Sequence, residues 1–367
     1  MRTLIPLSVH DRFPEIDYFR QPETQDKMTD LLFIFCKLAP EIGYRQGMHE
    51  LLAPLLWVVD FDSLVPSPSL DSLPHLVLAR DYVEHDTWSL FSALMKTART
   101  LYDHTPSVPL PVDRAAASST TSLTLAHAAG TSSTIVLVQP IVGTAIRIHD
   151  KLLQTVDPAL WAKMEKLRVE PQLYAIRWLR LLFGREFPIT DTLQLWDGLF
   201  AEDPSLRLIE YVCVAMLLRI RDALLGSDYS GFISLLLRFP APADGDQRIS
   251  LLLQQAIILR DNVSEAAGLR CRQQNISLGA TAGVASGDDS DDDRDHRARG
   301  HRSRQSVALN PQMGTAAALL AEGGGFVGDL AKGVYGRAEA MGINKALFGT
   351  FGDIRVSFLA LFFPIAF

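Results

Sequence analysis

Apolar side chains in this sequence recur with the period of an α-helix, and this pattern limits the chain to a helical fold. In residues 27–38 they are spaced i, i+3, i+4, i+7 and i+8, along one stripe: Met28, Leu31, Leu32, Phe35 and Cys36. No run of alternating apolar and polar residues is long enough to build a sheet. The expected fold class is therefore all-α, an irregular array of many helices rather than a regular bundle.

The clearest single helix is predicted to begin at Asp203-Pro204, which suit the N-cap and the first helical position. One apolar face then continues to Leu224, formed by Ile209, Val212, Cys213, Met216, Ile220, Ala223 and Leu224. Helical periodicity also predicts helices in residues 46–59, 80–103, 139–154, 158–167, 171–183, 191–201, 228–237 and 246–266.

Three stretches interrupt the helical pattern. Residues 61–75 are typical of a long loop, and residues 104–134, rich in Pro, Ser, Thr and Ala, predict a disordered insert. Residues 272–310 contain six aspartates followed by a basic cluster, which predicts a disordered charged linker. The expected organisation is a domain in 1–240, a helical extension in 241–271, the linker in 272–310, and a marginal helical tail in 311–367.

Composition excludes several classes of function. The 367 residues include 35 basic and 42 acidic side chains, and the net charge of −7 argues against a nucleic-acid binder. The three cysteines lie far apart, which excludes a disulfide framework and a cysteine-based zinc site. An HExxH zinc motif that begins at His49 is also excluded, because Ala53 stands where the second histidine would be. A GxxxxGK[ST] phosphate loop is missing, and no apolar run reaches the roughly 18–20 residues of a membrane span. We therefore expect a soluble intracellular protein with no metal or cofactor of its own.

One short string combines a turn with exposed polar groups. Tyr44-Arg45-Gln46-Gly47 lies between a helix expected to end near Pro40 and an apolar helix expected to begin at about Gly47. Polar residues at a helix start can point outward beside free backbone donors, a geometry suited to an anionic ligand. From the residues alone, Gln46 as a plain turn residue is the simpler interpretation.

A second block, Pro171 to Phe200, contains the strings RWLRLLFGREFP and LWDGLF. With YRQGM, it resembles the YxQG and RW…LF…EFP…LWD motifs of TBC-domain proteins, which are GTPase-activating proteins for Rab small GTPases. The strings YFR and QGMHELLAPL are most similar to the branch of TBC domain family member 5, which also carries an insert within the domain. The resemblance covers roughly residues 9–103 and 138–240.

Several residues of the second block have a structural interpretation of their own. Large aromatic side chains are expected in the core, because each buries a large apolar area: Trp178, Phe183, Phe187 and Trp196. Arg185 and Asp197 are expected to be structural pairing groups. Arg177 and Arg180 lie three residues apart on one helix face, which is typical of a solvated basic stripe, or of support for the Gln46 turn or for the partner surface.

The resemblance implies a role for each residue of the turn. An activator of a GTPase can supply a positioned water and stabilise charge on the γ-phosphoryl group in trans. By resemblance, Gln46 is the glutamine finger that orients the water, whereas Tyr44, Arg45, Gly47 and Arg177 support this site or contact the Rab. The implied partner is a Rab-family GTPase in its GTP-bound form, which holds the nucleotide and Mg²⁺ itself.

The arginine finger of the family is out of register here. The family pattern places arginine three residues before a proline, but before Pro14 that position is Asp11, and Ser8 takes the place of the family's aspartate. Arg12, the candidate finger, is displaced by one residue, which is about 100° on a helix. The helices that precede this motif in the family are also missing from the sequence, so we expect an N-terminally incomplete or degenerate member.

Three hypotheses follow for the function. The first is an activator of a Rab GTPase in vesicle or endosomal traffic, in the cytoplasm or peripherally on endosomal membranes. The second is a non-catalytic Rab-binding adaptor of the same fold. The third is a helical scaffold unrelated to GTPases. In the first two, the segments predicted to be disordered are candidate contacts for endosomal trafficking proteins.

Overall fold

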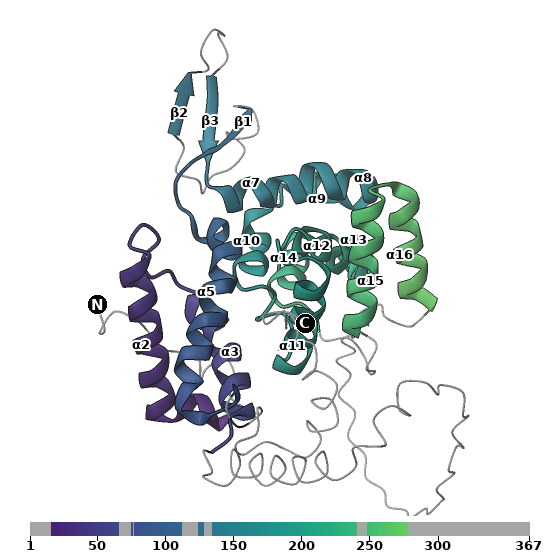
Figure 1. Cartoon of the computed structure of the whole chain (residues 1–367). Coiled ribbons are helices and arrows are strands. Elements are labelled where there is room, and N and C mark those ends of the chain that lie inside the picture. Colours follow the sequence, from purple (N-terminus) through teal and green to yellow (C-terminus); the bar gives the residue numbers. More distant parts are fainter. Residues whose placement is uncertain are drawn as a thin grey trace, which may run out of the picture. The chain divides into compact units, whose positions relative to one another are not determined.

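Helices form most of the described chain (Figure 1). The structure is a computed structural model, and it describes residues 16–65, 75, 77–111, 124–127, 134–240 and 248–277. All of these residues belong to one compact unit of the chain. The prediction of an all-α class is confirmed. Arg12, the rest of the linker from residue 278, and the tail in 311–367 lie outside the described residues.

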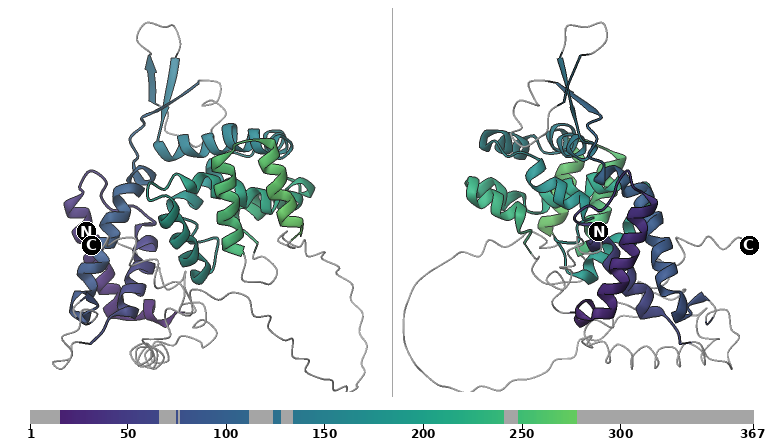
Figure 2. Two further views of the ribbon diagram at one scale, coloured as in Figure 1. Left: turned by 45° about the vertical axis from the view of Figure 1, so that its right-hand side comes forward. Right: turned by 90° about the vertical axis from the view of Figure 1, so that its left-hand side faces the viewer.

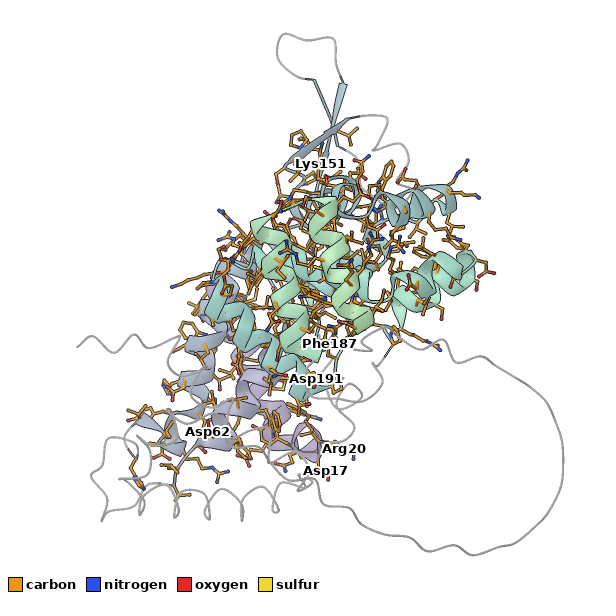
Figure 3. All side chains as sticks on the ribbon, turned by 90° about the vertical axis from the view of Figure 1, so that its right-hand side faces the viewer. Asp17, Arg20, Asp62, Lys151, Phe187 and Asp191 are labelled. Carbon is orange, nitrogen blue, oxygen red and sulfur yellow. The ribbon has the colours of Figure 1, made fainter. Side chains whose placement is uncertain are left out.

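The N-terminal helices pack on one another. They are η2 (Asp17–Arg20), α2 (Pro22–Leu38), α3 (Met48–Asp62), η3 (Arg80–Tyr82) and α5 (Val83–Tyr102). Helices α2, α3 and α5 contact each other in all three pairs, and the rings of Phe35 and Phe91 meet edge to face with centroids 5.1 Å apart. In Figure 3, Asp17 and Arg20 lie together before α2, where Arg20 Nη1 donates to Asp17 Oδ1 at 2.9 Å.

The helices after the insert form a second, larger group that packs around α12. They are α7 (Pro140–Arg147), the π-helix η4 (Ile148–Leu153), α8 (Gln154–Val156), α9 (Pro158–Leu167), α10 (Gln172–Arg180), α11 (Ile189–Glu202), α12 (Leu208–Arg219), α13 (Arg221–Gly226), α14 (Tyr229–Leu237), α15 (Arg248–Asp261) and α16 (Glu265–Ser277). Helices α15 and α16 lie side by side and both contact α12 (Figure 2). The predicted helical extension therefore packs directly on the domain, and its last helix ends at Ser277 rather than 271.

Helix α12 differs from its prediction. It begins at Leu208, because Asp203 accepts from the backbone N–H groups of Ser205 and Arg207 and so closes a turn instead of capping a helix. It ends at Arg219, and Ile220 separates it from α13. Nearly every side chain of α12 is buried, because α10, α11, α15, α16 and η4 surround it. A helix that is covered on all sides shows no amphipathic stripe in its structure.

A small antiparallel sheet lies between α5 and α7, where the sequence predicts only a disordered insert. Strand β3 (Thr134–Val138) is central, and β1 (Val108–Pro111) and β2 (Thr124–His127) pair with it on either side. Ser107 N–H donates to Val138 O at 3.0 Å and closes the base of the insert. Strands of four or five residues are too short to give a clear alternating pattern, which is why the sequence did not indicate them. Residues 112–123 and 128–133 lie outside the described residues.

The turn after α10 brings distant parts of the second block together. Leu182 and Phe183 have positive φ angles of 43° and 65°, and Trp196 Nε1 donates to Leu182 O at 2.9 Å. As predicted, Trp178, Phe183, Phe187 and Trp196 are buried in the core. This tight turn lets Arg185 and Glu186, which follow it, face different helices.

In the part of the chain that the structure describes, no helix combines the length and the apolar character that crossing a bilayer requires.

Candidate functional site

The turn that carries Gln46 is fixed by hydrogen bonds and by a left-handed glycine. Gly47, with φ 102°, is the N-cap of α3, and Met48 N–H donates to Arg45 O at 3.1 Å. Arg45 N–H donates to Met48 Sδ at 3.4 Å. Gln46 is exposed at the outside of this turn, whereas Gly47 and Met48 are buried beneath it. The local fold therefore presents the Gln46 side chain to solvent at the start of a helix.

The second sequence block forms the support of this turn. The Cβ that Gly47 lacks would lie 2.6 Å from Leu181 Cδ2, 3.5 Å from the Tyr102 hydroxyl and 3.8 Å from Arg180 Cδ. Tyr102 in turn donates its hydroxyl to Arg180 O at 2.7 Å. The end of α10 and the end of α5 thus pack against the back of the turn, and only glycine leaves room for them.

Tyr44 and the residues after Gly47 form a buried polar layer. The Tyr44 hydroxyl lies 2.9 Å from His49 Nδ1, and burial raises the pKa of Tyr44 to about 12. Burial also lowers the pKa of His49, with the nearby Arg185 acting in the same direction. Glu50 accepts from Arg185 Nε at 2.8 Å and from Arg185 Nη2 at 2.6 Å, a bidentate pair that joins α3 to the turn after α10. The Tyr44 hydroxyl is therefore held against α3, and Arg185 is a pairing group as predicted.

Arg177 pairs with the carboxylate of Glu186. Its Nε and Nη2 donate to the buried Glu186 at 2.9 and 2.8 Å, and Nη2 also lies 3.3 Å from Leu236 O. Arg180, one turn further along α10, is the arginine that contacts the Gly47 turn. The spacing of the two arginines indicated a common face, but only the structure distinguishes their partners.

Asp197 does not pair as the sequence predicts. Its Oδ1 is buried and has no hydrogen-bond partner among the described residues. Burial raises the pKa of its carboxyl to about 7. Asp197 therefore adds a buried, protonatable group within α11.

Two arginines and one histidine lie near the turn. Arg45 and Arg180 are half-buried and His104 is exposed. Burial lowers the pKa of Arg180, and the charge of Arg45 lowers it further. Burial also lowers the pKa of His104, and the charges of Arg45 and Arg180 act in the same direction. His104 had no signal in the sequence as a site residue, because it follows α5 and is remote from Gln46 along the chain, whereas support of the Gln46 turn is one of the interpretations that the sequence allows for Arg180.

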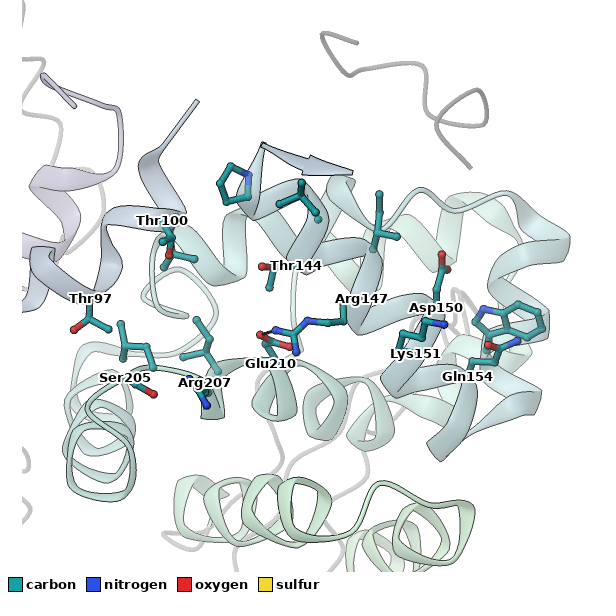
Figure 4. Close-up of a pocket in the computed structure, with 18 residues that line it drawn as sticks. Thr97, Thr100, Thr144, Arg147, Asp150, Lys151, Gln154, Ser205, Arg207 and Glu210 are labelled. Carbon is teal, nitrogen blue, oxygen red and sulfur yellow. Dashed lines mark hydrogen bonds and ion pairs between the residues drawn. The ribbon is translucent and has the colours of Figure 1, made fainter. Parts of the chain in front are cut away.

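A separate concave surface lies between α5, α7, η4 and α12 (Figure 4). This cavity of about 870 Å³ is lined by apolar side chains and by the ion pair of Arg147 Nη2 with Glu210 Oε1, which Figure 4 shows at its centre. Thr97, Thr144 and Lys151 also face it. None of the turn residues lines this cavity.

The structure brings together one set of metal-ligand types that the sequence did not suggest. Ligand atoms of His149, Asp150 and Glu165 lie within 4.8 Å of one another. His149 Nε2 and Glu165 Oε1 are 2.9 Å apart, so a direct hydrogen bond accounts for this arrangement. The absence of a metal remains a prediction.

Comparison with known proteins agrees with these two blocks. The family model of the Rab-GTPase-TBC domain matches residues 2–109 and 138–225 and omits the segment that holds the small sheet. TBC1 domain family member 5 from Homo sapiens is 36% identical over 280 residues, and the match covers 71% of this chain and 32% of the relative. TBC1 domain family member 13 from Homo sapiens is 28% identical over 232 residues, covering 63% of this chain and 46% of the relative. The chain thus spans about a third of the length of the first of these curated relatives.

A solved structure supports the fold. The crystal structure of the Ypt/Rab-GAP domain of Gyp1p superimposes with a TM-score of 0.52 and 20% sequence identity, over 70% of this chain and 72% of that chain. This likeness concerns the fold alone. Because the family model matches more than half of the sequence, in the segments that build and support the Gln46 turn, the chain belongs to the Rab-GTPase-TBC domain family.

Proposed function

We propose that this chain is a GTPase-activating protein for a Rab-family small GTPase and that Gln46 is its glutamine finger. The observation that carries the proposal is the exposed position of Gln46 on a turn held rigidly from behind by Leu181 and Arg180. A finger that orients a water must be fixed within a fraction of an ångström, and a turn packed against the core meets that need better than a free loop does.

Charge stabilisation on the γ-phosphoryl group falls to Arg12 in this proposal. Arg12 is one residue away from the register of the family's arginine, because Asp11 occupies that place. The sequence motif supports a finger from this segment, and the displacement argues for a weak one. The same displacement favours the second candidate, a Rab-binding adaptor that recognises the GTP-bound form without accelerating hydrolysis.

The setting that we propose is vesicle or endosomal traffic, with the protein in the cytoplasm or peripherally on endosomal membranes. The support for this setting is the membership of the chain in the same family as TBC1 domain family member 5. Contacts with endosomal trafficking proteins through the insert and the charged linker belong to the same proposal.

One experiment separates the activator from the adaptor. Single-turnover GTP hydrolysis is measured for a panel of purified Rab GTPases with and without this chain, beside binding of the same GTPases loaded with a non-hydrolysable GTP analogue. Acceleration of at least one Rab supports the activator. Binding without acceleration supports the adaptor, and neither binding nor acceleration contradicts both.

A further inference from the structure

Two guanidinium groups and one imidazole, from separate segments of the chain, lie beside Gln46; the lowered pKa of His104 makes its imidazole a neutral N–H donor near neutral pH. Arg45 directly precedes it in the turn. Arg180, on α10, has its Cδ 3.8 Å from the position of the Cβ that Gly47 lacks. His104 lies two residues after Tyr102, the last residue of α5, and the Tyr102 hydroxyl is 3.5 Å from the same position. His104 is near enough for the charges of Arg45 and Arg180 to lower its pKa. The ends of α5 and α10 and the turn itself thus bring these groups together.

Arg45 and Arg180 differ from five arginines of the described chain that are paired with carboxylates: Arg147 with Glu210, Arg177 with Glu186, Arg185 with Glu50, Arg221 with Asp157 and Arg260 with Glu202. Within the described residues, Arg45, Arg180 and His104 form no ion pair. Arg45 Nε is buried and has no hydrogen-bond partner there. A protein gains nothing for its own stability by gathering unpaired like charges, so an external anion is the natural complement.

Arg180 is held ready for such a partner. Its Nε lies 3.4 Å from Leu101 O, and its guanidinium carbon lies 5.8 Å from the centre of the Tyr102 ring. These contacts fix the plane of the guanidinium and leave its terminal N–H groups without a carboxylate. Little rotamer entropy is then lost when an anion binds.

We propose that Arg45, Arg180 and His104 form an anion-recognition cluster that receives a carboxylate side chain of the GTPase partner, next to the contact made by Gln46. This inference rests on the proposed function. The phosphates of a bound nucleotide are cradled by the GTPase's own phosphate loop and Mg²⁺. Groups that flank the glutamine finger therefore face the protein surface around the nucleotide, where carboxylates are the available anions. The cluster accordingly contributes to affinity and orientation, and Arg45 acts as a positioning residue.

Two charge variants and one control test the cluster. Arg45→Gln removes the charge, Arg45→Lys retains it, and Arg270→Gln removes the same charge from the exposed face of α16. For GTPases that the unmodified chain binds, we expect Arg45→Gln to weaken binding of the GTP-analogue complex about tenfold, chiefly through slower association at low salt. Arg45→Lys should retain most of the association rate, and Arg270→Gln should leave it unchanged.

A double-mutant cycle identifies the source of the anion. Surface Asp and Glu residues of the bound GTPase are replaced one at a time by Asn and Gln, and each is combined with Arg45→Gln. Coupling to one or two carboxylates supports the cluster as proposed. Weakened binding without coupling to any carboxylate, or a loss that follows the γ-phosphate of the nucleotide, would overturn it.

Measurements of GTP hydrolysis distinguish failure of the anion-recognition cluster from failure of the activator function. Where the unmodified chain stimulates hydrolysis, Arg45→Gln should raise KM with kcat nearly unchanged. Equal binding by Arg45→Gln and the unmodified chain would overturn the cluster and leave the activator intact. Binding that is weakened by Arg45→Gln in a chain without stimulation would support the cluster and contradict the activator.

Discussion

Gly47 lies so close to Leu181 that a Cβ on the glycine would sit 2.6 Å from Leu181 Cδ2. The contact joins the two strings of the sequence that resemble TBC-domain motifs, since one residue belongs to the Gln46 turn and the other to the end of α10. This contact holds the turn that carries Gln46, and the first two predictions depend on it.

The first prediction compares two glycines of the same turn region. Gly47→Ala should destabilise the protein by about 2–3 kcal/mol, because a φ of 102° and the contact with Leu181 both oppose a side chain. Gly43→Ala is the matched control, since its φ is 62° but nothing lies within 4 Å of the added carbon. It should cost about 1 kcal/mol. Urea unfolding measures both, and equal costs would contradict the role given to the contact.

The second prediction concerns Gln46. Gln46→Ala should reduce any stimulation of GTP hydrolysis by about 10²-fold, on the scale of losing one group that acts on the transition state. The melting temperature should change little, because the side chain is exposed. Single-turnover kinetics and thermal unfolding give the two readouts. An active protein whose rate is unaffected by the substitution would return Gln46 to the role of a turn residue.

The third prediction assigns Arg177 to the fold rather than to the Rab surface. Arg177→Met leaves the buried carboxylate of Glu186 without its bidentate partner, and should cost about 2–4 kcal/mol. Arg177→Met combined with Glu186→Leu should recover much of this loss, because no buried charge remains uncompensated.

Rab binding provides the check on this assignment. At a temperature where each variant is folded, Arg177→Met should bind a Rab as tightly as the unmodified chain does. Loss of binding in the folded variant would show that Arg177 contacts the partner instead.

The fourth prediction is a pH dependence from Asp197. Burial raises the pKa of this carboxyl to about 7, above its ordinary value of 3.8, so the folded state binds more protons than the unfolded state between these two pH values. The contribution of Asp197 to stability is therefore fully present below about pH 4 and is lost as the pH rises to about 7. Asp197→Asn should be no more stable than the parent at pH 4 and clearly more stable at pH 8. Melting curves across this range would contradict the prediction if the difference did not grow with pH.

The fifth prediction concerns Arg12. A well-placed arginine finger contributes about 10³–10⁵ in rate, and the displaced Arg12 should give much less. We expect weak or absent stimulation by the unmodified chain, with Rab binding partly retained, and Asp11→Arg alone should help little. Strong stimulation that Arg12→Ala abolishes would contradict this expectation and establish Arg12 as a working finger.

The sequence predicts local structure well where one face of a helix is apolar. Helix α9 begins and ends where its periodicity indicates, at Pro158 and Leu167, and α11 is close to its predicted range, whereas α2 begins at Pro22, before the apolar stripe in 27–38. It fails at the ends of α12, because this helix is covered on several sides and buries even Glu210 and Arg219, so that no amphipathic pattern marks where it begins and ends. It also misses strands β1 and β2, which are stabilised by pairing with β3 rather than by their own composition.

The sequence likewise predicts part of the candidate site and misses the rest. Gln46 and Gly47 are adjacent in one motif, so a single string indicates both. The difference between Arg177 and Arg180 depends on where the turn after α10 directs the chain, and the partners involved are Glu186 for one and Tyr102 for the other. Contacts between residues remote along the chain leave no mark on periodicity or composition. The position of His104 beside the turn is of this kind, and no pattern in the sequence could have indicated it.

The hydrogen bond from Ser107 N–H to Val138 O has a practical consequence for engineering. It ties both ends of the insert together at its base, so the closing of this loop does not depend on the segment beyond. The entropy of closing a loop grows only slowly with its length, by about 0.6 kcal/mol for each doubling. The far end of the insert is therefore a suitable place for a fluorescent reporter or an epitope tag, which would follow the protein without disturbing the helices on either side.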